Sequence, residues 1–157
     1  MSMQGAVFSR RSFMGGLAAV GAMPLLPGCR SMCAGKGPRS KFGGVQIGVI
    51  TYSYRSMPDK SAEAVLKQVV DSGINSIELM GDVVEKYAGS SLEKVAELRK
   101  MYADAGVGIH IVKFGNIGDK NCTDERIAYY FNVAKALGAQ AITREISEEA
   151  AKRVGPM

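Results

Sequence analysis

The sequence predicts an α/β fold in which parallel strands alternate with helices, and three observations point to it. Short apolar, β-branched runs recur at a nearly constant interval. Segments with helical spacing of apolar residues lie between them, each opened by a hydroxyl residue and closed by a glycine. The 157 residues are 46% hydrophobic, which suffices for one buried core. Consecutive strands joined by helices form a parallel sheet with right-handed crossovers.

The expected strands are the apolar runs at 45–52, 76–80, 107–113 and 139–143. Their starts at 45, 76, 107 and 139 are separated by 31, 31 and 32 residues. Short apolar runs bounded by turn residues are typical of parallel strands that are buried on both faces. We therefore predict four strands in one sheet.

The expected helices cover 61–72, 91–105 and 123–137, and a fourth begins at 147. Each of the first three opens on a serine or threonine with an acid in its first turn, which is a typical N-cap pattern. Each is followed by a glycine, which suits the left-handed backbone that often ends a helix. The capping residues are Ser61, Ser91 and Thr123, and the glycines are Gly73, Gly106 and Gly138.

The links decide between two α/β architectures. Links from helix to strand are tight, whereas those from strand to helix are long, at 53–60, 81–90 and 114–122. No glycine follows the first strand in 52–58 and no Walker lysine motif follows any strand, which disfavours a nucleotide-binding open sheet. A repeat of about 31 residues matches the roughly 250 residues of an eight-unit barrel. The predicted fold is the N-terminal half, about four βα units, of a (β/α)8 TIM barrel.

The N-terminal segment predicts export. Arg10 and Arg11 precede an apolar run, 13–26, which is too short and too glycine-rich to span a membrane. The string resembles a twin-arginine signal, the alternative being a helix packed on the domain. The sequence around Cys29 resembles a lipobox, so Cys29 is a candidate for lipidation and for a membrane tether. We expect a protein that is periplasmic or anchored on the periplasmic side of the membrane.

These features divide the chain into a signal peptide at 1–29, a flexible tether at 30–43 and the barrel domain at 44–157. Residues 1–40 hold five basic and no acidic residues, which accounts for the whole net charge of +5. The remaining residues hold 15 basic and 15 acidic residues, so the body is neutral. This balance argues against a nucleic-acid partner. The three cysteines form no Cys-x-x-Cys pair, and we expect no structural disulfide.

The strings at 44–55, at 73–81 and at 98–107 resemble the xylose isomerase-like TIM barrel family of sugar phosphate isomerases and epimerases. Lys113 and the string at 134–138 continue the match. The resemblance implies an exported isomerase or epimerase, or a related lyase, that acts on a sugar or keto-sugar with a divalent metal (Mn, Mg, Co or Zn). It places most metal ligands on the fifth to eighth strands, beyond residue 157. We therefore expect a truncated chain that binds metal weakly and does not complete turnover alone.

Proton abstraction beside a carbonyl needs a carboxylate base and a group that stabilises the oxyanion. Glu145, after the fourth strand, is the leading base and metal ligand, or else an early acid of the fourth helix. Glu78 ends an apolar strand, where an unpaired acid is costly, and serves the site or forms an ion pair with Lys113. Lys113 itself binds substrate or stabilises an enolate, unless it is a solvated surface lysine.

Three residues after the first strand, Tyr52, Tyr54 and Arg55, are candidates to line a sugar pocket. The alternative is that they only pack within their loop. The single histidine, His110, is out of phase with Lys113 along its strand, so we expect it to pack under the helices and not to bind metal. The alternative function is a non-catalytic exported α/β carbohydrate-binding module or an inactive fragment. The oligomeric state is left open.

Overall fold

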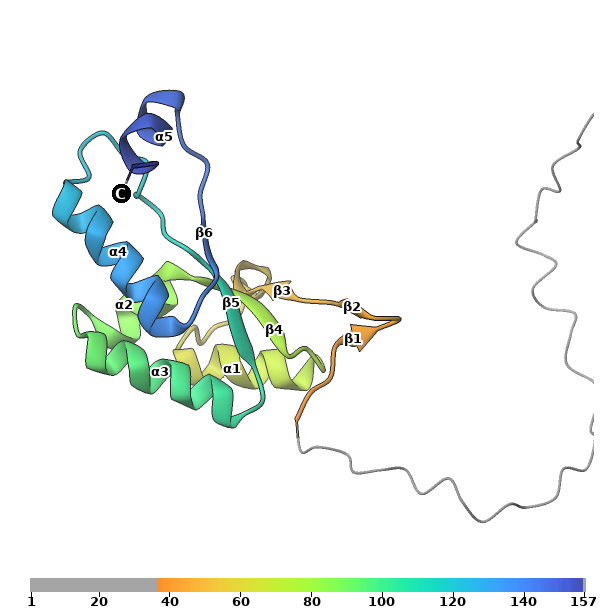
Figure 1. Cartoon of the computed structure of the whole chain (residues 1–157). Helices are drawn as coiled ribbons and strands as arrows, with labels where there is room; N and C mark the ends of the chain where they lie inside the picture. The colour runs from red at the N-terminus through yellow and green to blue at the C-terminus, as the bar shows by residue number, and fades with distance from the viewer. Residues whose placement is uncertain (1–36, 157) are drawn as a thin grey trace, which may run out of the picture. The chain divides into compact units, whose positions relative to one another are not determined.

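The computed structural model describes residues 37–156, which form a four-stranded parallel sheet and five α-helices (Figure 1). The strands follow the chain in the order β3-β4-β5-β6. Doubly wound sheets reverse their strand order, whereas barrels do not. The sheet strands are β3 (Val49–Ile50), β4 (Ser76–Met80), β5 (Gly108–Lys113) and β6 (Ala141–Thr143). The helices are α1 (Ala62–Asp71), α2 (Gly81–Ala88), α3 (Leu92–Asp104), α4 (Asp124–Leu137) and α5 (Glu148–Val154).

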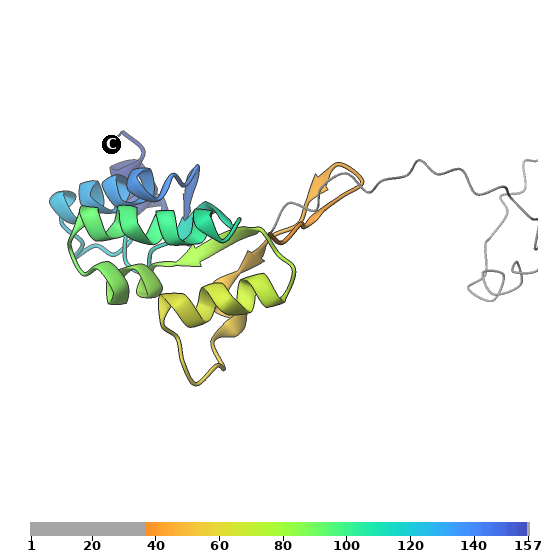
Figure 2. The same cartoon turned by 90° about the horizontal axis from the view of Figure 1, so that it is seen from below.

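The helices α1 to α4 line one face of the sheet, each packing on the next (Figures 1 and 2). On that face Ile77, Leu79 and Val112 are at most 2% exposed. Glu78 and Lys113, which point to the opposite face, are only half-buried. The sequence prediction of strands buried on both faces is therefore wrong for residues 37–156. The α/β fold, with four successive strand–helix units of the kind that build a (β/α)8 barrel, is confirmed.

Local signals placed most helix ends correctly. The hydroxyls of Ser61, Ser91 and Thr123 each accept a hydrogen bond from the backbone N–H three residues on, as does that of Ser147. Gly138 ends α4 with φ +72°, and Gly73 and Gly106 have φ +73° and +78° after α1 and α3. These are the predicted positions.

The first predicted strand is broken. Residues 45–52 divide into β2 (Val45–Gln46), β3, and a 3₁₀ turn over Thr51–Tyr54. β2 pairs with β1 (Lys41–Phe42) in an antiparallel hairpin, separate from the parallel sheet. The predicted tether therefore ends earlier than residue 43, because Ser40 is 1% exposed and bonds to Asn75 Oδ1 at 2.7 Å.

Residues 81–90, predicted as a loop, contain the helix α2 instead. Tertiary packing explains the error, because Val83, Val84 and Ala88 are buried against the core. The core also holds Tyr102, which is fully buried and donates a hydrogen bond to the Ala62 carbonyl oxygen at 3.0 Å. Burial raises the pKa of Tyr102 above its ordinary value.

Candidate functional site

Two hollows lie at the carboxyl ends of β3, β4 and β5, where functional groups gather in parallel α/β folds. One, of about 260 Å³, lies between the ends of β4 and β5, and the other, of about 170 Å³, lies between the ends of β3 and β4. Met80 and Asp82 line both. The long strand-to-helix links of the sequence therefore carry the candidate site.

A close backbone approach shapes this edge. At Gly81, β4 passes directly into α2. A Cβ atom at this position would lie 2.8 Å from the Lys113 carbonyl oxygen and 2.6 Å from a ring carbon of Phe114. Only glycine therefore fits without displacement, and it brings the first turn of α2, with Asp82, against the end of β5.

The larger hollow contains a connected group of polar side chains from three elements. Arg126 of α4 donates to Glu85 Oε1 of α2 at 3.0 Å. The Tyr130 hydroxyl donates to Asn116 Oδ1 and lies 3.4 Å from Glu85 Oε1. The Tyr130 ring stacks on Phe114 with centroids 4.4 Å apart. We call Glu85, Asn116, Arg126 and Tyr130 the α2–α4 cluster.

Arg126 is held from several sides. Its guanidinium carbon lies 4.8 Å from the Tyr130 ring centroid and 5.0 Å from that of Tyr129. The Tyr130 hydroxyl raises the pKa of Arg126, with partial burial working against it. Burial raises the pKa of Tyr129, although Arg126 lowers it. Of the two cations lining this hollow, Arg126 is paired with a carboxylate, and Lys113 belongs to none of the ion pairs formed within residues 37–156.

The smaller hollow is lined by Tyr52, Tyr54 and Arg55, the three residues predicted to line a sugar pocket. Tyr52 is 53% exposed, and the Arg55 guanidinium carbon lies 4.8 Å from its ring centroid. The Tyr54 hydroxyl is engaged with Ser72 Oγ at 3.2 Å. The buried Thr51 accepts a hydrogen bond from the Met80 N–H at 3.0 Å, which ties this turn to the end of β4.

Glu78 and Lys113 lie on the helix-free face of the sheet. Glu78 is the middle residue of β4, so the prediction that it ends this strand is wrong; the strand continues to Met80. In the strand register Met80, Lys113 and Thr143 are neighbours in one row, two residues beyond Glu78 along β4. Glu78 Oε1 accepts a hydrogen bond from Thr143 Oγ1 at 2.6 Å. Neither Glu78 nor Lys113 takes part in an ion pair within residues 37–156, so the expected alternative of a Glu78–Lys113 pair is not observed.

Glu145 is exposed and follows the last residue of β6, Thr143, by two positions. His110 is exposed as well, so the prediction that it packs under the helices is wrong. The register of β4 and β5 shifts between Ile77 and Glu78, so His110 has no register partner on β4. The shift breaks the regular alternation of side chains along β5 on which the prediction for His110 depended. Within residues 37–156 no three His, Cys, Asp or Glu side chains gather as a metal site.

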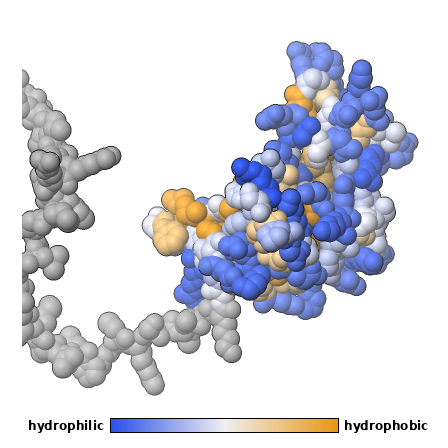
Figure 3. Space-filling view, turned by 180° about the vertical axis from the view of Figure 1, so that it is seen from behind, coloured by the Kyte–Doolittle hydropathy of each residue, from blue (hydrophilic) through white to orange (hydrophobic). Residues whose placement is uncertain are grey.

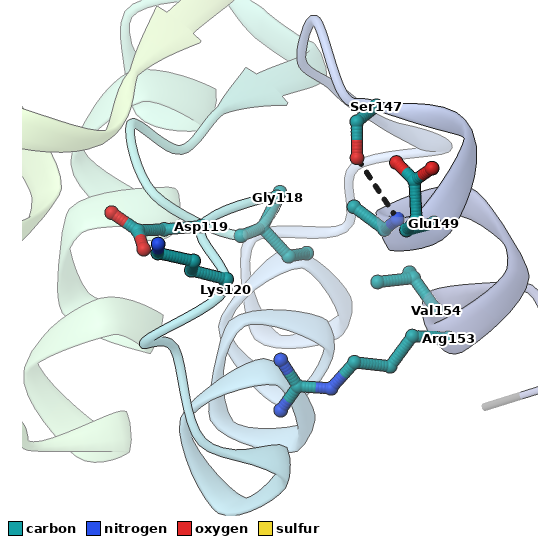
Figure 4. Close-up of a pocket in the computed structure, with 9 residues that line it drawn as sticks. Gly118, Asp119, Lys120, Ser147, Glu149, Arg153 and Val154 are labelled. Carbon is teal, nitrogen blue, oxygen red and sulfur yellow. Dashed lines mark hydrogen bonds between the residues drawn. The ribbon is translucent and has the colours of Figure 1, made fainter.

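A further hollow, of about 180 Å³, lies between the β5–α4 link and α5 (Figure 4). Its polar groups have structural tasks. Ser147 caps α5, and Arg153 Nη2 donates to the Cys122 carbonyl oxygen and to Asp124 Oδ1, both at 2.5 Å. Asp119 and Lys120 point away from α5 (Figure 4). We therefore assign this hollow to the attachment of α5.

The sequence pointed to Lys113, Tyr52, Tyr54 and Arg55 at this edge, but not to the α2–α4 cluster. Arg126 lies in the first turn of a predicted helix and Glu85 in a predicted loop, 41 positions apart. The only local signal was the position of Arg126 beside a strand-to-helix link.

Residues 7–27 match the family model of the TAT (twin-arginine translocation) pathway signal sequence. The chain thus carries a signal for export across the membrane, as predicted from Arg10 and Arg11. These residues and Cys29 lie outside the part that the structure describes, and the match ends before Cys29. Within residues 37–156 no helix has the length and apolar character needed to cross a bilayer.

No significant match is found among curated proteins. Among solved structures, the chain is similar to the probable 3-DHS dehydratase AsbF, involved in petrobactin synthesis, from Bacillus anthracis. The TM-score is 0.48 and the sequence identity is 16%. The match covers 62% of this chain and 37% of that one, so this chain spans little more than a third of its length.

Proposed function

We propose that this chain contributes to an exported enzyme that transfers a proton on a sugar or keto-sugar, of the isomerase or epimerase type. One observation carries the proposal. A carboxylate, Glu78, and an ammonium group, Lys113, lie on one face of the sheet, with Lys113 at the carboxyl end of β5 and Glu78 two residues before the end of β4. Within residues 37–156 Lys113 forms no ion pair. Lys113 lines the larger hollow, and Met80, two residues after Glu78 on β4, lines both hollows, whose other walls carry hydroxyl, amide and carboxylate groups.

These two groups have the chemistry that enolisation requires. The Glu78 carboxylate takes the proton from the carbon next to a carbonyl, and the electron pair moves onto the carbonyl oxygen. The Lys113 ammonium stabilises the resulting oxyanion. In an isomerisation the hydroxyl proton on the deprotonated carbon moves to the oxyanion, and the abstracted proton returns to the neighbouring carbon. In an epimerisation the proton returns to the opposite face of the same carbon.

The remaining groups suit sugar binding. The exposed Tyr52 ring offers an apolar surface for the C–H face of a sugar, and Arg55, Asp82 and Asn116 supply donors and acceptors for hydroxyl groups. We propose that Thr143 orients Glu78 through its 2.6 Å hydrogen bond.

The family resemblance implies a divalent metal, but residues 37–156 do not bring three ligands together for one. We therefore assign each step to the chain's own residues. Glu145 enters the proposal as a second carboxylate at the same edge, available as proton donor or as a single metal ligand. The export signal supports a location across the membrane. We propose that this chemistry takes place on the periplasmic side, either in solution or held by a lipid at Cys29.

The test is exchange of carbon-bound protons of a ketose with deuterium in heavy water, followed by proton NMR with the whole chain. Exchange reports proton abstraction itself and needs no complete turnover. We expect exchange above the buffer rate, and at least a tenfold loss in Glu78→Gln and in Lys113→Met. Lys120→Met is the matched control and should keep the rate, because the Lys120 side chain lines neither of the two hollows.

The exposed Tyr52 ring also favours a second candidate, a carbohydrate-binding module without catalysis. That function predicts sugar binding that is weakened by Tyr52→Ala, with no exchange in any variant. Exchange that survives Glu78→Gln would contradict the proposed base.

A further inference from the structure

The hairpin formed by β1 and β2 projects from the amino end of the sheet, away from the two hollows (Figures 1 and 2). Its tip carries Phe42, 65% exposed, and Val45, 61% exposed, on either side of a turn at Gly43 and Gly44. Ile47, directly after the hairpin, is 43% exposed. Figure 3 shows this tip as an apolar knob that stands out from the body.

The hairpin is held in a defined position. Ser40, at its base, is buried, and its hydroxyl donates to Asn75 Oδ1 and lies 2.7 Å from the Ile47 carbonyl oxygen. Gln46 Nε2 donates to Asn75 Oδ1 at 2.9 Å. Polar side chains thus fix the base of the hairpin to the link before β4, and the apolar residues are left at the far end.

The charge around the tip has one sign. Lys41 is exposed beside Phe42, and the chain contains no acidic residue before Asp59. The helices α1 and α3 end at the same end of the sheet as the hairpin, with Asp71 and Asp104 as their last residues. Each aspartate is paired with a lysine one turn earlier, Asp71 with Lys67 and Asp104 with Lys100. The amino end of the sheet therefore has a positive tip and no unpaired carboxylate at these helix ends.

The hairpin follows the export signal closely in the sequence. The export signal matches residues 7–27. The residues from there to Phe42 span at most about 50 Å when fully extended. A domain whose leader is still in the bilayer, or is anchored there, therefore keeps this tip within reach of the lipid headgroups.

We propose that the tip of the hairpin docks on an anionic membrane surface on the exported side, with Phe42 and Val45 in the headgroup region and Lys41 facing lipid phosphates. Apolar side chains combined with basic ones are the features by which peripheral proteins bind such surfaces. Because the hollows lie at the opposite end of the sheet, docking leaves the candidate site open to solutes. The inference does not depend on the proposed function.

The experiment uses the absence of tryptophan from the chain. Phe42→Trp introduces a single fluorophore at the tip in the whole chain, and vesicles of phosphatidylethanolamine and phosphatidylglycerol with brominated acyl chains serve as the probe. We expect a blue-shifted emission and quenching on anionic vesicles. In this background Lys41→Gln should raise the lipid concentration for half-maximal quenching about fivefold on anionic vesicles, with no change on phosphatidylcholine.

Phe131→Trp is the matched control, because Phe131 is an exposed phenylalanine (39%) on α4, and its emission should stay unquenched. Quenching at residue 131 equal to that at residue 42 would overturn the proposed orientation. No quenching at residue 42, while the protein sediments with the vesicles, would overturn docking by the hairpin. A blue shift without vesicles that grows with protein concentration would show a second copy on the tip and would also overturn the proposal.

Discussion

Substitution of Gly81 by alanine tests how tightly the edge of the candidate site is built. The new Cβ atom would lie 2.8 Å from the Lys113 carbonyl oxygen and 2.6 Å from a carbon of the Phe114 ring. Phe114 is 1% exposed and stacked on Tyr130, and the Lys113 backbone is held in β5, so neither can retreat freely.

Alanine in place of glycine gains up to about 1 kcal/mol in a helix, whereas overpacking costs about 1–3 kcal/mol. We expect the clash to dominate, with a net loss of about 1–2 kcal/mol in the free energy of unfolding. The melting temperature should fall by roughly 4 °C for each kcal/mol. Urea denaturation of the whole chain measures the loss.

Gly115→Ala is the matched control, because it lines the same hollow and a Cβ atom there meets nothing within 4 Å. Its stability should stay within about 0.5 kcal/mol of the parent. Equal stabilities for the two variants would refute the close approach of α2 and β5.

Three further predictions concern other parts of the chain. Tyr102→Phe removes a buried hydrogen bond and should cost about 1 kcal/mol in urea denaturation. Because burial raises the pKa of Tyr102, only the unfolded chain loses this proton above about pH 10, so stability should fall there, and less steeply in Tyr102→Phe. Arg153→Gln should speed amide hydrogen exchange in α5 about three- to tenfold, and unchanged exchange would deny its attachment role. Replacing Arg10 and Arg11 by lysine should block export of a reporter fused to the leader, and continued export would contradict a twin-arginine route.

The parts of the fold that local chemistry decides were predictable. The capping hydroxyls of Ser61, Ser91 and Thr123 act within one turn, and the strand 76–80 was predicted with the bounds that β4 has. The helix α2 was missed because its eight residues are stabilised by contacts with the core, which no local pattern reports. The break in the first strand was missed because pairing of β2 with β1 competes with the parallel sheet.

The candidate site divides in the same way. Lys113 was predictable at the carboxyl edge, because topology alone places the end of a strand there. The contact between Glu85 and Arg126 depends on how two helices pack, and the position of His110 depends on a register shift between two strands. Neither the helix packing nor the register shift can be predicted from the spacing of residues in the sequence.

We propose that the hollows at the carboxyl ends of β3, β4 and β5 bind a sugar. The most direct measurement is two-dimensional NMR of the ¹⁵N-labelled whole chain during titration with a panel of aldoses and ketoses. We expect saturable shifts at the amides of Arg55, Asp82, Lys113 and Asn116, which line the two hollows. A separate hollow is lined by Phe131 and Ala134 of α4 and by Ala141 and Ile142 of β6. Shifts confined to that hollow, or no shift with any sugar, would refute sugar binding at the candidate site.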